Sequence, residues 1–191
     1  MINIRSERSA DTAAREALLD VAYGTSRFTK PSQRLRAGRE AAVALVATEQ
    51  GRLVGSVRLW PVATGADRAA SSAALLLGPL AVHPDRRRRG IGAALMRRAI
   101  RAARQAGHAV VLLVGDAAYY GRFGFSAETT GALWLPGPYE RDRLLACELA
   151  PGALLGARGL IGAIGRLTPA PSLNVLIAGL SGGAASARHA A

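Results

Sequence analysis

The sequence is poor in three kinds of residue, and each shortage excludes something. Lys30 is the only lysine, so arginine carries almost all of the positive charge. Cys147 is the only cysteine, so no internal disulfide can form and nothing indicates an oxidising compartment. Aromatic residues make up only 5% of the chain, so alanine, leucine and valine must fill most of its interior.

Long apolar segments are also missing. The N-terminus is charged from Arg5 onward and has no apolar stretch of the kind found in signal peptides. The longest uncharged run, between Arg166 and Arg188, contains prolines and a glycine pair and too few consecutive large apolar residues to span a bilayer. We therefore expect a soluble, cytoplasmic protein with no membrane partner.

The composition that remains is that of a folded protein with an anionic partner. Half of the 191 residues are hydrophobic and a fifth are charged, which is enough for one domain with a core. The net charge of +12 indicates an anionic partner, which could be a phosphate, a nucleic acid or an acidic surface.

The order of the local patterns predicts a mixed α/β fold. Strand-like and helix-like segments alternate, and the apolar segments from Ala74 to Gly115 predict a right-handed strand–helix–strand unit. The expected strands lie in 2–8, 41–51, 52–62, 73–84, 108–115, 132–137 and 144–152, and the expected helices in 9–24, 30–38, 90–107 and 116–125.

We expect residues 1–150 to form the domain and residues 151–191 to be a C-terminal extension rich in glycine, alanine and proline. The extension is either a loosely packed tail or a segment that docks on the domain or on a partner. A homodimer is compatible with the second alternative.

Four consecutive arginines, Arg86 to Arg89, run into Gly90-Ile91-Gly92 at the start of the clearest predicted helix. The first amides of a helix are unpaired and carry partial positive charge, and glycine lets an anion approach them closely. A pyrophosphate fits such a site. A P-loop is excluded because no lysine follows these glycines. A Rossmann fingerprint is excluded because Leu95 stands where its third glycine belongs.

The pattern Arg-x-x-Gly-x-Gly at 87–92 resembles the acetyl-CoA signature of the GNAT superfamily of acyl-CoA-dependent N-acyltransferases. The resemblance extends over "LGPLAVHPDRRRRGIGAALMRRAI" (77–100), and "YYGRFGF" (119–125) is similar to a second family motif that follows one strand later. It covers about 75–125 by motif and 1–150 by segment order.

This resemblance implies a GNAT fold, in which flanking helices cover a mixed sheet with a splayed pair of parallel strands. It implies direct transfer of an acetyl group from acetyl-CoA to an amine on a small molecule or protein, without a metal. Tyr120 would protonate the leaving thiolate, and the backbone of Leu80, Ala81 and Val82 would hold pantetheine. The pyrophosphate would bind to Arg87, Arg88, Arg89, Gly90, Ile91, Gly92 and Ala93.

Several alternatives stay open at this stage. Pro79 in an apolar strand indicates either a bulge or a strand start, and Tyr120 could be a packed aromatic residue. The central strand carries no acid, so no general base is evident. The nearest candidates by chain position are Glu40, Glu49, Asp116 and His83, and we expect no role for His83.

The acceptor site is expected near the first two helices, where five basic residues cluster: Arg27, Lys30, Arg34, Arg36 and Arg39. They would either favour an acidic acceptor or form a solvated face. Two other functions compete with catalysis. One is a CoA-binding module without turnover. The other, less favoured, is a nucleic-acid-binding protein that uses the helical stripe of Arg97, Arg101 and Arg104.

Overall fold

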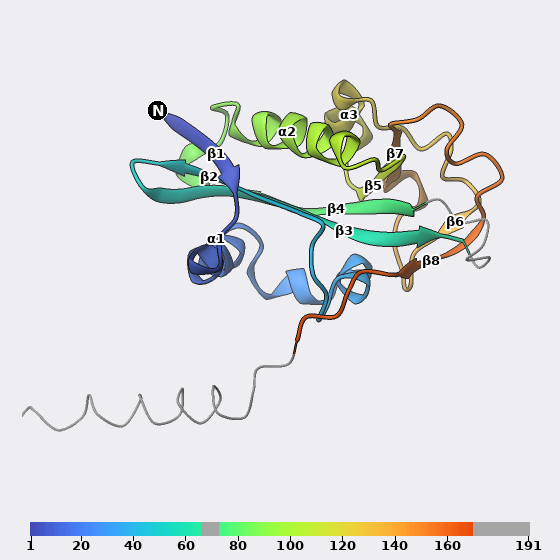
Figure 1. The fold of residues 1–191 in the computed structure, drawn as a ribbon, viewed down its shortest axis with the longest axis horizontal. Coiled ribbons are helices and arrows are strands. Elements are labelled where there is room, and N and C mark those ends of the chain that lie inside the picture. Colours follow the sequence, from blue (N-terminus) through green and yellow to red (C-terminus); the bar gives the residue numbers. More distant parts are fainter. Residues whose placement is uncertain (66–72, 170–191) are drawn as a thin grey trace, which may run out of the picture.

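A computed structural model describes residues 1–65 and 73–169 of the chain (Figure 1). Its strands are β1 (Ile2–Ser6), β2 (Val43–Glu49), β3 (Arg52–Thr64), β4 (Ala73–Val82), β5 (Val110–Val114), β6 (Leu133–Trp134), β7 (Leu144–Glu148) and β8 (Gly159–Ala163). Its α-helices are α1 (Thr12–Tyr23), α2 (Ile91–Gln105) and α3 (Ala117–Tyr120), and two 3₁₀ helices, η2 (Gly24–Phe28) and η3 (Pro31–Leu35), follow α1.

These strands form one mixed sheet in the order β1-β2-β3-β4-β5-β7, with β8 beside β3 and β6 beside β8. The pairs are antiparallel except β4 with β5 and β6 with β8, which are parallel. The mixed α/β class and the parallel pair predicted from the sequence are confirmed. The predicted hairpin is confirmed as well, because β2 and β3 pair across a turn in which Gln50 and Gly51 have positive φ.

Helix α2 covers one face of the sheet, and its contact with β3 depends on a glycine. Leu95, Met96 and Ala99 of α2 are fully buried against the sheet. A Cβ atom added to Gly55 of β3 would come within 3.0 Å of Leu95. The missing side chain therefore lets α2 lie close to β3. This close packing buries the apolar side of the helix.

The opposite face is covered by α1 and the two 3₁₀ helices (Figure 1). Leu18 and Leu19 of α1 pack against Ala81 of β4. The second predicted helix is present as η3, which begins at Pro31, where a helix does not need the missing amide. The two faces thus carry different elements, and β3 presents alternate residues to each of them.

Strand β8 lies inside the segment expected to be an extension. It pairs with β3 through Val62–Ala163 and its neighbours, and Leu154 and Ile161 are buried. Residues 151–169 therefore pack on the sheet, whereas residues 170–191 lie outside the described ranges. No helix in the described ranges is long and apolar enough to cross a membrane.

Candidate active site

Strands β4 and β5 separate partway along their length. Their parallel pairing begins at Ala74–Val110 and ends at Leu76–Leu112, although β4 continues to Val82. Beyond this point lies a cavity of about 90 Å³, which we call the strand gap. Its lining residues are Tyr23, Arg27, Lys30, Ser32, Arg36, Leu77, Gly78, Pro79, Leu80, Leu113, Val114 and Tyr120.

The separation coincides with Gly78 and Pro79. The register between β3 and β4 shifts here, so that Val57 faces Leu80 whereas Leu59 faces Leu77. Proline has no amide to donate to a sheet, and Gly78 has a φ of 136°, which other residues rarely adopt. Pro79 therefore sits in a bulge within a continuous strand, which confirms the first of the two interpretations given above.

The backbone of β4 offers hydrogen-bonding groups to the strand gap. The amide of His83 donates to the carbonyl of Val54 in β3 at 2.9 Å. Because residues of an antiparallel strand alternate in the direction of their backbone groups, Ala81 also faces β3. Leu80 and Val82 consequently present their amides and carbonyls on the side away from β3.

Two side chains hold the bulge from the α1 face. The indole N–H of Trp60 donates to the carbonyl of Gly78 at 2.9 Å, and the hydroxyl of Tyr23 donates to the carbonyl of Leu80. The sequence did not indicate either contact. Both residues lie far from the motif, and an aromatic residue at such a position is usually part of the core.

A groove of about 420 Å³ lies at the N-terminus of α2, and we call it the α2 groove. Gly90 precedes the helix in the left-handed conformation, with a φ of 76°, and no side chain of the described residues caps the first amides. A Cβ atom on Gly92 would lie 3.4 Å from the hydroxyl of Tyr119. The groove is lined by Val82, Arg86, Arg87, Arg88, Gly90, Ile91, Gly92, Ala93, Tyr119 and Arg122.

The four arginines before α2 divide into two pairs. Arg86 and Arg89 both contact Glu49 of β2, at 2.5 and 3.1 Å. Arg87 and Arg88 are exposed and have no acidic partner within the described residues. The groove thus keeps two free guanidinium groups beside the unpaired amides of the helix, which is an arrangement suited to a multiply charged anion.

The adjacent tyrosines of α3 face different cavities. Tyr119 lines the α2 groove, where Arg122 lies over its ring at 4.0 Å. Tyr120 lines the strand gap and packs against Gly115, where an added Cβ would come within 2.2 Å of its ring. Burial raises the pKa of Tyr120 to about 12, so its hydroxyl is protonated at any physiological pH.

A third cavity, of about 260 Å³, lies on the α1 face, and we call it the α1 pocket. It shares Arg27, Arg36 and Pro79 with the strand gap, so the two cavities adjoin. Its other lining residues are Arg15, Glu16, Leu19, Phe28, Gln33, Ala37, Gly38, Arg39, Ser56, Arg58, Trp60 and Thr168.

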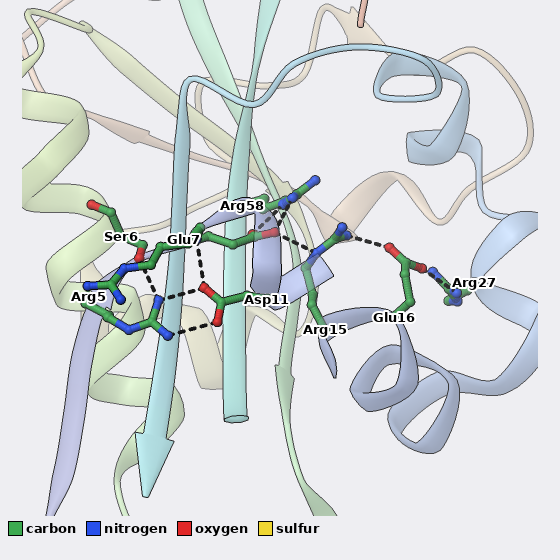
Figure 2. Close-up of polar contacts among 9 residues, drawn as sticks. Arg5, Ser6, Glu7, Asp11, Arg15, Glu16, Arg27 and Arg58 are labelled. Atoms are coloured by element: carbon green, nitrogen blue, oxygen red, sulfur yellow. Dashed lines mark hydrogen bonds and ion pairs between the residues drawn. The ribbon is translucent and has the colours of Figure 1, made fainter. Parts of the chain in front are cut away.

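Ion pairs connect the wall of the α1 pocket (Figure 2). The buried carboxylate of Glu7 pairs with both Arg15 and Arg58. Glu16 bridges Arg15 and Arg27, at 2.5 and 2.7 Å. Alternating charges of this kind fix the guanidinium groups in place and neutralise them.

The four residues named above as nearest to the site by chain position lie outside the strand gap and the α1 pocket. Glu49 is held by two arginines, Asp116 accepts from the amide of Ala118 at the start of α3, and Glu40 is exposed. His83 accepts from the amide of Asp85 and lines neither the strand gap nor the α1 pocket. Glu16 is the one acid that lines the α1 pocket in the described part of the chain, and no acid lines the strand gap.

Most of the site residues predicted from the sequence fall into two groups. The α2 groove contains Val82, Arg87, Arg88, Gly90, Ile91, Gly92 and Ala93, and the strand gap contains Leu80 and Tyr120. The side chains of Arg89 and Ala81 line neither cavity. In residues 1–65 and 73–169, no group of three His, Cys, Asp or Glu residues could hold a metal ion.

A sheet with a splayed parallel pair beside a helix-terminal groove defines the GNAT fold. A family model described as an acetyltransferase (GNAT) domain matches residues 40–127. The uncharacterized N-acetyltransferase YhbS of Escherichia coli K12 is 31% identical over 160 residues, which cover 83% of this chain and 93% of YhbS. The uncharacterized N-acetyltransferase YjhQ of the same strain is 36% identical over 98 residues, which cover 51% of this chain and 53% of YjhQ.

Solved structures agree. The crystal structure of Escherichia coli YhbS in complex with CoA has a TM-score of 0.73 at 28% identity and covers 85% of this chain and 89% of its own. A GNAT acetyltransferase from Brucella melitensis in complex with acetyl-CoA has a TM-score of 0.61 at 26% identity, with coverage of 91% and 97%. This chain belongs to the GNAT acetyltransferase family, and as a member it is an acyltransferase.

Proposed function

We propose that the protein transfers an acetyl group from acetyl-CoA directly to an amine while both substrates are bound. The observation that carries this proposal is that one short stretch of β4 connects the two cavities. Leu80 lines the strand gap and Val82 lines the α2 groove, so an extended arm can run along this stretch from one cavity to the other. The structural relatives crystallised with CoA and acetyl-CoA support the same donor.

The α2 groove is proposed to hold the pyrophosphate. The free amides of Ile91, Gly92 and Ala93 would donate to its oxygens, with Arg87 and Arg88 supplying the opposite charge. Arg89 would contribute through its backbone, because its side chain is held by Glu49. The outward amides and carbonyls of Leu80 and Val82 would pair with the amide groups of pantetheine.

The strand gap is proposed to hold the thioester. The neutral amine attacks the acetyl carbon, the new C–N bond forms, and the C–S bond breaks. Tyr120 gives its hydroxyl proton to the leaving sulfur and regains one from solvent, while the amine nitrogen releases a proton to water. A high pKa suits this role, because the hydroxyl is available as a donor throughout the working range of pH.

A thiol-release assay against a panel of amines, amino acids, peptides and aminoglycosides tests the proposal, together with thermal unfolding in the presence of acetyl-CoA. At about 100-fold excess over its dissociation constant, a ligand that binds only the native state adds about 2.7 kcal/mol of stability. Gly92→Asp should abolish this stabilisation, because it places a negative side chain against the pyrophosphate.

Gly131→Asp is the matched control, because Gly131 is exposed and an added Cβ would have no atom of the described residues within 4 Å. Full stabilisation by acetyl-CoA in Gly92→Asp would contradict the proposed donor site. Stabilisation without thiol release for any acceptor would instead favour the CoA-binding module that does not turn over. The cytoplasmic location and the homodimer stay predictions.

A further inference from the structure

The ion pairs around the α1 pocket balance most of its positive charge. Arg15, Arg27 and Arg58 share three carboxylates, which belong to Glu7, Glu16 and Asp20. These three arginines are therefore satisfied before any ligand arrives. Their role in the pocket wall is structural, and they do not by themselves require an anion.

Arg36 differs from these three. It is only 8% exposed, yet its one side-chain hydrogen bond within the described residues runs from Nε to the amide oxygen of Gln33 at 3.0 Å. Within the described residues it makes no ion pair. A buried charge without a counterion is costly, so an uncompensated cation at this position indicates a ligand that supplies the missing negative charge. Its pKa is lowered to about 10, which reflects the same burial.

The free edge of Arg36 faces the shared cavity. Because Gln33 occupies Nε, the two terminal nitrogens are left for a ligand, and Nη1 lies 3.7 Å from a Cβ built on Gly78. Arg36 lines both the α1 pocket and the strand gap, where the acetyl group is proposed to lie. Two parallel N–H groups match the two oxygens of a carboxylate.

We infer that the acceptor is a small molecule that carries a carboxylate as well as the reacting amine, and that Arg36 binds this carboxylate. The inference rests on the proposed function, since it assumes that the amine enters the strand gap from the α1 pocket. A cavity of about 260 Å³ is the size of a small-molecule site, which favours an amino acid or a similar compound over a folded protein.

Positive charges in the strand gap explain how the amine could lose its proton without a general base. Lys30 and Arg36 line the strand gap and make no ion pair within the described residues, and no acid among those residues lines it. Arg27 lines the gap too, but Glu16 and Asp20 balance its charge. Nearby cations disfavour the protonated form of an amine. The amine of a bound acceptor therefore loses its proton more readily than in water, while its carboxylate stays attractive to Arg36.

Matched substrate pairs test the inference in the unmodified protein. Each of the common amino acids is compared with its own carboxamide, and ethanolamine is compared with O-phosphoethanolamine, by thiol release and by mass analysis of the product. We expect kcat/KM to be roughly 10- to 100-fold higher for the preferred amino acid than for its amide, the worth of a charged hydrogen bond. A preference for O-phosphoethanolamine over ethanolamine, with none for any amino acid over its carboxamide, would show that the acceptor carries a phosphate and not a carboxylate. Equal rates within every pair would show that the acceptor needs no negative charge.

Arg36→Gln is the informative variant, with Arg34→Gln as the control, because Arg34 is exposed and lines neither cavity. Arg36→Gln should abolish the preference for the carboxylate and leave the KM for acetyl-CoA within about twofold. Without ligand its thermal midpoint should equal or exceed that of the wild type, because an unpaired buried charge has been removed. A large drop in the midpoint would show that Arg36 has a structural role instead.

The two proposals fail in different ways. If acetyl-CoA binds and amines react without regard to a carboxylate, the proposed function stands and this inference is wrong. If acetyl-CoA neither binds nor releases thiol, the proposed function is wrong. In that case amino acids should still raise the thermal midpoint of the wild type, and not of Arg36→Gln, if the inference about Arg36 is right.

Discussion

The α2 groove and the α1 pocket are both rich in arginine, but they use it differently. In the groove, Arg87 and Arg88 are exposed, adjacent in sequence and without acidic partners in the described residues. In the pocket, Arg15 and Arg58 are tied to a buried carboxylate. Water stabilises an exposed cation until a ligand arrives, whereas a buried cation needs a counterion, and Glu7 is that counterion for Arg15 and Arg58. The difference shows that the counterion and the burial, not the residue type, decide what an arginine does.

The largest effect is expected in the strand gap, at Tyr120. Tyr120→Phe keeps the ring and its packing and removes only the hydroxyl, so turnover should fall by roughly 10²- to 10⁴-fold while acetyl-CoA affinity changes little. Single-turnover rates and acetyl-CoA binding measure the two effects separately.

Tyr119→Phe is the control for this prediction, because its hydroxyl faces the α2 groove. It should change acetyl-CoA binding more than the chemical step. Unchanged chemistry in Tyr120→Phe would remove this hydroxyl from the mechanism.

A smaller effect is expected on stability, and only on the pocket side. Glu7→Gln removes the buried charge that Arg15 and Arg58 share, so the free energy of unfolding should fall by about 3 kcal/mol. Urea unfolding measures it, and Glu128→Gln is the exposed control. A loss of less than about 0.5 kcal/mol, the size of surface effects, would mean that the network does not hold the fold.

Removing Arg87 and Arg88 from the α2 groove should weaken the binding of acetyl-CoA and leave the binding of the amine unchanged. Arg87→Ala combined with Arg88→Ala should raise the KM for acetyl-CoA roughly 10- to 100-fold and leave the KM for S-acetylpantetheine unchanged, since that compound lacks the phosphates. Its stability should not fall, because two like charges at a helix N-terminus have been removed.

Arg98→Ala with Arg101→Ala loses the same charge from the exposed face of α2 and serves as the control. An equal loss for both donors would place these arginines outside the phosphate site. Tight, salt-sensitive binding to DNA that this control abolishes would instead favour the nucleic-acid-binding alternative.

The smallest effect concerns pH. Burial raises the pKa of Tyr120 from 10.0 to about 12, so its acidic form persists at every pH below that value. The kcat/KM profile, measured from roughly pH 6 to 10, should therefore rise as the amine loses its proton and then level off. Tyr120→Phe should lower the whole curve without changing its shape. A descending limb in this range that disappears in Tyr120→Phe would contradict the high pKa.

How much of the site could be predicted differs between the same two regions. The α2 groove is built from neighbouring positions, because the amides at a helix start and the loop before it must lie together. Its glycines and Arg87 and Arg88 could therefore be found from the sequence. The position of the Arg89 side chain could not, because it depends on Glu49, which is 40 positions away and reaches it only through the pairing of β2 in the sheet.

The α1 pocket shows the opposite case. Arg36 was one of five basic residues in a cluster, and its isolation became visible only after the partners of its neighbours were known. Glu7 and Arg58 are 51 positions apart in the chain. Strand β8 was missed because its five residues, "GLIGA", include two glycines and show little alternation. The fold class was predictable, since the strong apolar strands and α2 have clear periods.

Residues from both faces of the sheet line the strand gap, Tyr120 from the α2 face and Arg36 from the α1 face, and this has a kinetic consequence for the proposed reaction. In the proposed complex the acetyl donor lies along the α2 face and the acceptor enters from the α1 face, so neither covers the exit of the other. Each product can leave by the side on which its parent entered, and no order of binding is imposed by obstruction. Initial-rate patterns should then be those of a random sequential enzyme, in which CoA competes with acetyl-CoA and not with the amine.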